Sequence, residues 1–332
     1  MLFPSVSDAY ARAVGGFLRA RGLPPGAQRL VAARTRVEGA FFGDALTRAG
    51  HELGDPALGA AFGLRVGGAA FGLLGVAAAS AGTLREAIHH LQRFEALTST
   101  LGRLQMREEA RTVTLCWQPD APVAPSVVEA ILAGWVSFGR YLLDEPVPVL
   151  GVCFTHKACA PAWHHEDLLA CPVRFGAESN AVVIPRELLA LKPRCADARL
   201  NAALSAWLDG CTVAVQASAH RPVTQRVAAL LSLEDLYAID QESAAARLRF
   251  SARTLQRRLA GEGTRFRHLL DAARAQRGIV GVLRGDLPLL ELGAHVGFEE
   301  QSSLCRAFRR WTGYAPLALR QRLASLAGEL RP

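Results

Sequence analysis

The last 92 residues of the chain contain the same short pattern twice: an apolar helix, a tight turn and a second helix with a single apolar face. The first copy occupies residues 242–260 and the second residues 289–311, and a further helical stretch over 264–284 lies between them. No run of alternating apolar and polar residues, which would indicate a strand, interrupts this region. The sequence therefore predicts an all-helical (all-α) C-terminal domain with two helix-turn-helix units joined by a long helix.

The second helix of each copy has apolar residues on one side and mainly Arg, Gln and Ser on the others. In the first copy Ser251 is the expected N-cap, and Leu255 and Leu259 are spaced as i and i+4. In the second copy Phe308 and Trp311 lie on the apolar side. A helix with arginine and glutamine on its outer face suits insertion into the major groove of DNA.

The positive charge of the chain is confined to this same region. The chain has 38 basic and 30 acidic residues, a net charge of +8. Residues 1–240 hold 22 of each sign, whereas residues 241–332 hold 16 arginines and eight acidic residues. A general bias toward arginine would be spread evenly along the chain, so this step indicates a domain that binds a polyanion.

The part of the chain before this region predicts a mixed (α+β) domain. Three apolar runs predict strands, at 111–117, 147–154 and 181–184. Thr83 and Glu86 predict a capping box that opens a helix. A linker is expected near 210–222, which divides the chain into a domain over 1–215 and a helix-turn-helix domain over 216–332.

Targeting and redox features favour the cytoplasm. The first residues lack the basic segment and apolar stretch of an export signal, and seven cysteines without tight pairs favour a reducing compartment. Between Arg65 and Arg85 lie 19 uncharged residues. They are mostly Gly and Ala, which contribute little apolar area, so we expect buried globular structure here and no membrane contact.

An apolar stripe precedes the linker and has two interpretations. Its members share helical spacing: Leu200, Leu204, Trp207 and Leu208. The stripe either packs on its own domain or forms a dimerisation helix.

An enzyme is not expected, and neither is a cofactor. The chain has no phosphate-binding loop, no nucleophile elbow and no H-E-x-x-H helix. One segment, residues 153–171, suggests an alternative, a regulator that senses metal or redox state through Cys153, His156, Cys159, His164, His165 and Cys171. Its spacing matches no common closed zinc site and core-like residues such as Phe154 interrupt it, so no metal site is predicted.

Two segments of the helical region resemble the AraC/XylS family of bacterial regulators. Residues 289–320, LLELGAHVGFEEQSSLCRAFRRWTGYAPLALR, resemble the family signature, and residues 251–270, SARTLQRRLAGEGTRFRHLL, resemble its first recognition helix. More loosely, FGLLGVAAASAGTLREAIHHLQRF and CPVRFGAESNAVVIPRELLA are similar to an arabinose-binding-type effector domain of one branch of this family. The resemblance implies a cytoplasmic, homodimeric transcription regulator, with double-stranded DNA, a small-molecule effector in the N-terminal domain and RNA polymerase as partners.

The chain departs from the family pattern at several positions. Arg249 replaces the usual turn glycine of the first unit, where a positive φ costs about 1 kcal/mol. Gly293 stands where Ala is usual, Leu304 where an aromatic residue is commoner, and Gly278 and Gly281 weaken the connecting helix. We therefore expect reduced rigidity, particularly of the first unit.

The resemblance and the helical geometry together assign candidate DNA contacts. The predicted base contacts are Arg253, Gln256, Arg257, Gln301, Ser302 and Arg306. The predicted phosphate contacts are Thr254, Arg258, Arg309 and Arg310.

Overall fold

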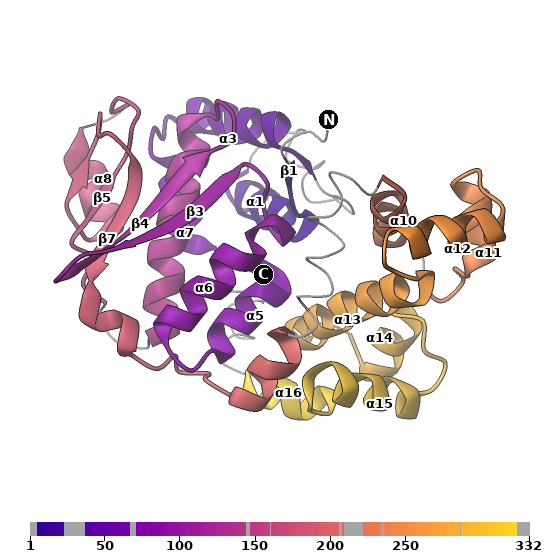
Figure 1. The fold of residues 1–332 in the computed structure, drawn as a ribbon. Coiled ribbons are helices and arrows are strands. Elements are labelled where there is room, and N and C mark those ends of the chain that lie inside the picture. The colour runs from indigo at the N-terminus through magenta and orange to yellow at the C-terminus, as the bar shows by residue number, and fades with distance from the viewer. Residues whose placement is uncertain are drawn as a thin grey trace. The chain divides into compact units, whose positions relative to one another are not determined.

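A computed structural model of the chain describes residues 5–22, 37–66, 71–143, 147–159, 161–205, 208, 222–233, 236–285 and 287–323. By their internal contacts the residues form two compact units, an N-terminal unit, Phe3–Ala196, and a C-terminal unit, Asp197–Arg331. The N-terminal unit is mixed α/β and the described part of the C-terminal unit is helical, as the sequence predicts (Figure 1).

A five-stranded sheet lies at the centre of the N-terminal unit, with the strand order β3–β4–β7–β5–β6. Neighbouring strands are antiparallel except β5 and β6, which are parallel. The strands are β3 (Gly102–Glu108), β4 (Thr112–Pro119), β5 (Gly151–Cys153), β6 (Val173–Arg174) and β7 (Asn180–Pro185). A second, two-stranded sheet pairs β1 (Ser5–Val6) with β2 (Val37–Glu38).

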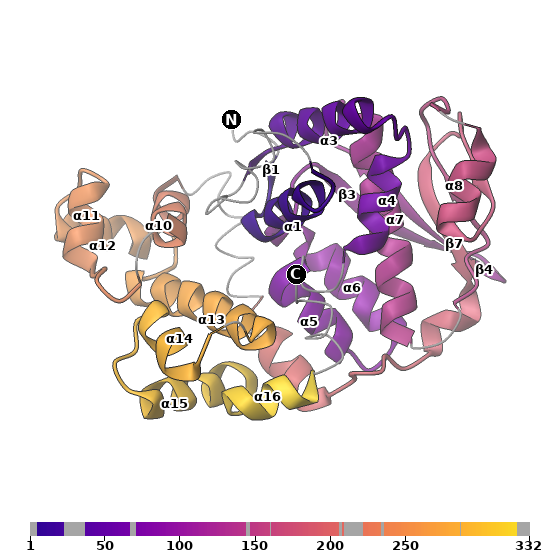
Figure 2. The same cartoon turned by 180° about the vertical axis from the view of Figure 1, so that it is seen from behind.

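Helices α6 (Leu84–Phe94) and α7 (Pro125–Leu143) pack against the large sheet, α6 on β3 and α7 on β7. The remaining helices of this unit are α1 (Asp8–Arg19), α3 (Gly39–Leu53), α4 (Leu58–Arg65), α5 (Gly72–Ser80) and α8 (Ala162–Leu169), with short 3-10 turns η2 (Glu95–Leu97) and η3 (Arg186–Ala190). Helix α4 lies along α7 (Figure 2).

The predicted strands at 111–117 and 181–184 are confirmed as β4 and β7. The third is shorter than predicted, because residues 147–150 lie outside any regular strand although Leu150 N–H donates to the Val183 carbonyl at 2.8 Å. Pro148, which has no N–H to donate to a ladder, accounts for the late start at Gly151.

The helix expected after Thr83 is confirmed as α6. Thr83 Oγ1 accepts from Glu86 N–H at 3.2 Å, whereas the Glu86 carboxylate accepts from Gly82 N–H at 2.8 Å. The predicted capping box is therefore only half formed, because its return bond ends one residue before the N-cap.

The uncharged run between Arg65 and Arg85 includes α5, which is buried from Leu73 to Ser80, as expected for globular structure. Residues 67–70 of that run lie outside the described residues. One helix of the described residues, α7, is long and apolar enough to cross a membrane, and 61% of that stretch is buried inside the protein.

The C-terminal unit contains seven named helices in the part of the chain that is described. They are α10 (Pro222–Leu233), α11 (Gln241–Arg247), α12 (Ala252–Gly261), α13 (Phe266–Arg284), α14 (Leu289–His295), α15 (Gln301–Thr312) and α16 (Pro316–Arg322). In both views α13 runs between one group formed by α10, α11 and α12 and another formed by α14, α15 and α16 (Figures 1 and 2). The predicted connecting helix is thus confirmed as α13.

Residues 198–205 are helical and belong by their contacts to the C-terminal unit, earlier in the chain than the predicted domain boundary at 215. Asp197 accepts from Leu200 N–H at 3.0 Å and from the Tyr314 hydroxyl at 2.8 Å, and it forms an ion pair with Arg322. This segment is therefore tied to the turn before α16 and to α16 itself.

The apolar stripe lies on this segment. Leu200, Leu204 and Leu208 are buried, and Trp207 lies outside the described residues. The described residues of the stripe are therefore buried, as the packing interpretation expects, but their segment belongs to the C-terminal unit and not to the predicted 1–215 domain. Dimerisation through this stripe stays a prediction.

Candidate nucleic-acid interface

The first helix-turn-helix unit consists of α11 and α12. Asp240 caps α11, because its carboxylate accepts from Ser243 N–H at 2.8 Å while Ser243 Oγ accepts from Asp240 N–H at 3.1 Å. Ser251 caps α12 as predicted and accepts from Thr254 N–H at 3.2 Å. Leu255 and Leu259 are fully buried, so the apolar side of α12 faces the core of the unit.

The core of this first unit includes α10, which lies in the stretch after the linker that the sequence predicts as helical without giving this helix its bounds. Val223, Val227 and Leu231 of α10 are buried in one cluster with residues of α11, α12 and α13. Glu262 accepts from Val223 N–H at 3.2 Å and from Thr224 N–H at 2.7 Å, and so caps the start of α10. The predicted linker over 210–222 ends where this helix begins.

The turn between α11 and α12 contains Arg249 at φ 60°, in the left-handed region that favours glycine. Arg249 N–H donates to the Ala246 carbonyl at 3.0 Å and Phe250 N–H to the Ala245 carbonyl at 2.8 Å, which closes the end of α11. The positive φ inferred at this position is confirmed.

We expect Arg249→Gly to stabilise the protein by about 0.5–1 kcal/mol, because glycine adopts this φ without steric cost. Urea unfolding of the variant measures the change. Arg249→Ala is the matched control, since it removes the same charge but keeps the strain. Equal stabilities of the two variants would show that charge, and not backbone strain, governs this position.

The second unit consists of α14 and α15, joined through Gly297 at φ 85°. Phe298 follows, and its ring lies 5.9 Å from that of Trp311 on α15. The residues that we expected to face inward on α15 are buried: Leu304, Ala307, Phe308 and Trp311.

The two glycines of α13 have a packing role that the sequence alone did not suggest. A Cβ on Gly278 would lie 3.1 Å from the Phe308 ring, and one on Gly281 would lie 2.4 Å from Leu292 Cδ1. The absence of a side chain therefore allows α14 and α15 to approach α13 closely, which offsets the lower helix propensity of glycine.

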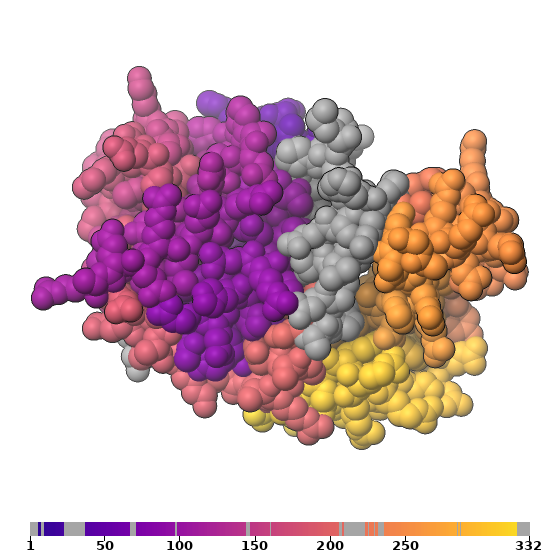
Figure 3. Space-filling view, in the orientation of Figure 1, coloured from indigo at the N-terminus to yellow at the C-terminus, as the bar shows by residue number. Residues whose placement is uncertain are grey.

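The predicted base contacts are exposed on the outer faces of α12 and α15. On α12 these are Arg253, Gln256 and Arg257, and on α15 they are Gln301, Ser302 and Arg306. Two of them already have polar partners on the same surface, since Ser302 Oγ donates to Glu300 Oε2 at 2.9 Å and Arg306 donates to Ser303 Oγ at 2.9 Å. In Figure 3 the first unit is orange and the second is yellow, seen from the same side as in Figure 1.

The predicted phosphate contacts have more structural partners than expected. Arg310 donates to Asp271 Oδ1 of α13 at 2.6 Å, and the same carboxylate accepts from the Trp311 indole N–H at 3.2 Å. The Arg258 guanidinium lies 4.7 Å from the centre of the Phe250 ring. Arg309 is exposed, whereas Thr254 is half-buried and its Oγ1 accepts from Ser251 Oγ at 2.8 Å.

Several arginines of the C-terminal unit have structural roles. From the arginine-rich region, Arg274 donates to the Leu236 carbonyl at 3.0 Å and Arg277 to the Leu231 carbonyl at 2.9 Å, and Arg226, earlier in the chain, donates to the Leu248 carbonyl at 2.9 Å. These carbonyls lie at or just after the ends of short helices, where carbonyl groups lack helical partners. Sequence reasoning missed this role because nothing in the local sequence shows which carbonyl an arginine reaches.

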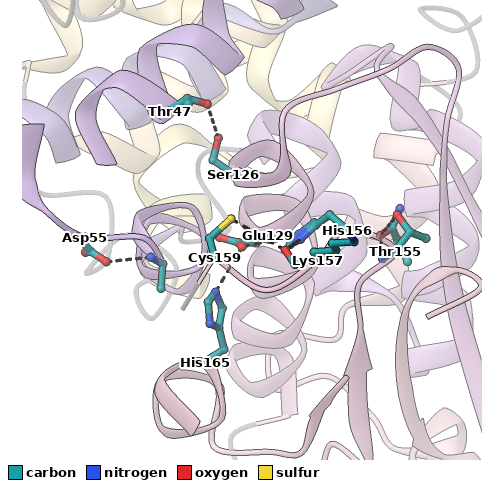
Figure 4. A network of polar contacts seen from close by, with 11 residues as sticks. Thr47, Asp55, Ser126, Glu129, Thr155, His156, Lys157, Cys159 and His165 are labelled. Carbon is teal, nitrogen blue, oxygen red and sulfur yellow. Dashed lines mark hydrogen bonds and ion pairs between the residues drawn. The ribbon is translucent and has the colours of Figure 1, made fainter. Parts of the chain in front are cut away.

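The Cys/His segment that suggested metal or redox sensing belongs to the N-terminal unit. Buried His165 and half-buried His156 approach the buried carboxylate of Glu129 on α7, with Nε2 to Oε1 distances of 3.3 and 3.6 Å (Figure 4). Burial lowers the pKa of His156, although Glu129 acts in the opposite direction.

The surroundings of this group are aromatic. The His156 ring stacks on Phe154 with the ring centres 5.2 Å apart, and the Phe175 ring lies 5.0 Å from that of His165. Among the described residues, no group of three or more His, Cys, Asp or Glu side chains is placed to hold a metal ion. The six described cysteines are unpaired, so the structure gives no support to the sensing alternative within the part of the chain that it describes.

The arrangement of an α/β unit with a helical unit that carries two helix-turn-helix motifs defines a class of protein, the two-domain DNA-binding regulators. The sequence agrees with this class along most of its length. Residues 13–193 match the family described as the arabinose-binding domain of AraC transcription regulators, and residues 244–322 match a helix-turn-helix domain family. The chain belongs to the AraC family of transcription regulators.

Several characterised relatives are similar along most of this chain. The ornithine utilization regulator of Pseudomonas aeruginosa is 28% identical over 278 residues, which cover 81% of this chain and 79% of the relative. The regulator VirS of Mycobacterium tuberculosis is 26% identical over 305 residues, 90% of this chain and 88% of the relative. Among solved structures, the regulator CdpR of Pseudomonas aeruginosa is 23% identical with a TM-score of 0.47 and covers 93% of this chain and 97% of that one.

Proposed function

We propose that this protein recognises a specific DNA site through α12 and α15 and that a small molecule bound by the N-terminal unit controls the recognition. The observation that carries the DNA-binding half is the exposure of Arg, Gln and Ser on both helices, while their apolar sides are buried. A recognition helix needs this division between a buried and a base-reading side.

The two helices supply complementary chemistry. Arg253, Arg257 and Arg306 offer guanidinium forks for guanine O6 and N7, and Gln256 and Gln301 offer amides for adenine. Arg258, Arg309 and Arg310 take the phosphate contacts, with Thr254 at the start of α12. For Arg310 this requires exchange of its Asp271 partner for a phosphate oxygen.

The family and the fold support effector control. The N-terminal unit contains two neighbouring cavities beside the large sheet. A ligand that binds one conformation of the regulator better than another shifts the population toward that conformation. If the two conformations differ in DNA affinity, the ligand changes the DNA affinity of the protein. We further propose that the regulator acts in the cytoplasm as a homodimer, with Leu200, Leu204, Trp207 and Leu208 as candidate dimerisation residues, and that it contacts RNA polymerase as an activator.

The DNA-binding proposal is tested by selecting bound fragments from genomic DNA of the source organism with the full chain and footprinting them. We expect protection of two successive major-groove segments about 10 base pairs apart, one for each recognition helix. Affinity for the selected site should fall with salt, with a slope in log K against log salt of about −3 or steeper if three arginines neutralise phosphates. A chain that selects no common sequence, or binds without salt dependence, contradicts the proposal.

A further inference from the structure

Two adjoining cavities lie in the N-terminal unit. The first, about 60 Å³ and partly open, is lined by residues of α1, α3, α5, α6, α7, β3 and β4, and its lining includes Tyr10, Phe42 and Glu95. The second, about 50 Å³, lies between the large sheet and helices α6 and α7. Leu91, Leu104 and Trp135 line both, so the two spaces adjoin at these three side chains.

The lining of the second cavity is almost entirely apolar, and the Trp135 indole N–H is the only polar side-chain group among the residues that line it. Its walls are aliphatic and aromatic, and they include Ala87 and Leu91 of α6 and Val182 of β7. A polar group placed there would lose its hydrogen bonds to water without replacement. This cavity therefore accepts only a hydrocarbon part of a ligand.

The first cavity contains one carboxylate, that of Glu95, at the start of η2. Glu95 Oε2 accepts from Leu104 N–H of β3 at 2.7 Å, which holds the side chain in place and engages only one of the two carboxylate oxygens. Burial raises the pKa of Glu95 to about 7, although Arg103 acts against this shift. The carboxylate is thus a poorly solvated acceptor that a cationic donor would stabilise.

A sugar does not fit the second cavity. A pentose carries several hydroxyl groups, each of which needs a hydrogen-bond partner once it leaves water. The first cavity offers Tyr10, Thr98 and Ser99 besides Glu95, whereas no side chain that lines the second cavity has a hydroxyl, carboxylate or amide group. The family description as arabinose-binding therefore does not extend to the ligand chemistry of the second cavity.

We propose that the two cavities together bind an elongated apolar molecule with a single amine, its ammonium group at Glu95 and its hydrocarbon body across Leu91, Leu104 and Trp135 into the second cavity. This inference names the ligand class for the effector control proposed above, and the regulatory role of the ligand rests on that proposed function. The site itself rests on the lining of the cavities and the position of Glu95.

The test measures binding of n-octylamine to the full chain at about pH 8, where Glu95 is largely ionised and an alkylamine is protonated. Isothermal titration gives the affinity, and the fluorescence of Trp117 and Trp135, which line the first cavity, reports on occupancy. We expect saturable 1:1 binding of octylamine, at least about ten-fold weaker binding of octanoate because like charges repel, and no binding of L-arabinose.

Two variants locate the ligand. Glu95→Gln keeps an acceptor for Leu104 N–H but removes the charge. We expect it to lower the affinity for octylamine by about ten-fold or more and to change the affinity for 1-octanol by no more than about two-fold. Ala87→Leu fills part of the second cavity and should reduce the advantage of octylamine over n-butylamine. Glu178→Gln, the same change at an exposed carboxylate of the same unit, is the control and should leave every affinity unchanged.

The outcomes separate the site from its regulatory role. If octylamine does not bind saturably, or if Glu95→Gln and Ala87→Leu leave its affinity unchanged, the site assignment is overturned, whatever happens to DNA binding. If octylamine binds with the expected dependence on both variants but does not alter affinity for the selected DNA site, the site is supported and control through it is contradicted.

Discussion

Arg306→Ala is expected to weaken binding to the specific DNA site by about 1–3 kcal/mol, or roughly 5- to 150-fold, and to relax the preference at one base pair. Arg306 is exposed on α15, and its guanidinium is held only by Ser303 Oγ in the hydrogen bonds described above. It can therefore turn to a base edge at the cost of one hydrogen bond to a neutral hydroxyl group. Competition binding against operator variants with single base changes measures both effects.

Arg309→Ala is the matched control for this experiment. It removes the same side chain from the same helix, three residues further on, at another exposed position. As a phosphate contact, Arg309 should contribute equally to all sequences, and its loss should reduce the salt slope by about one. If Arg306→Ala weakened every operator variant equally and changed the salt slope in the same way, Arg306 would be a phosphate contact and not a base contact.

Gly297→Ala is expected to destabilise the protein by about 2–4 kcal/mol and to abolish specific DNA binding. Gly297 has φ 85°, which costs a residue with a Cβ about 1 kcal/mol or more. In addition, its Cβ would lie 2.3 Å from the Leu236 carbonyl oxygen and 2.6 Å from Arg274 Nη2, the two atoms of an existing hydrogen bond. The backbone cannot make room without breaking that bond, so the turn of the second unit would separate from the first.

Gly261→Ala is the control for Gly297→Ala. Gly261 is the last residue of α12, and a Cβ there would meet nothing within 4 Å. Alanine should therefore leave stability unchanged or raise it by up to about 1 kcal/mol, as helix propensity predicts. Urea unfolding followed by circular dichroism compares the two variants. Equal stabilities would refute the close approach of Gly297 to Leu236.

Local sequence patterns predicted much of the fold. The apolar period of α15 predicted its buried face, and the N-cap pattern predicted the role of Ser251, whereas the positive φ of Arg249 followed from the family resemblance. Strands β4 and β7 were found from alternation alone. The bounds of α10 and its place in the first unit were not predicted, because its three buried positions belong to a core assembled from four helices and a single short segment carries no sign of its partners.

The net charge of a segment predicted the DNA-binding region, but the charge of a single arginine did not predict its role. The step in net charge marked the DNA-binding region, but Arg274, Arg277 and Arg310 each contact another element of the C-terminal unit. The local sequence does not distinguish an arginine that donates to a carbonyl near a helix end from one that is exposed to solvent. Their roles differ only through contacts with residues far along the chain.

The order of residues was sufficient for the helices of the two helix-turn-helix units, for the helix between them and for the faces that these helices bury, because these features follow from interactions within a few residues. Only the tertiary structure showed which arginines have structural partners and which are exposed. It also showed the close approach of other segments to Gly278, Gly281 and Gly297, and the two cavities near Glu95. These features depend on distances between segments that are remote in sequence, and packing determines those distances.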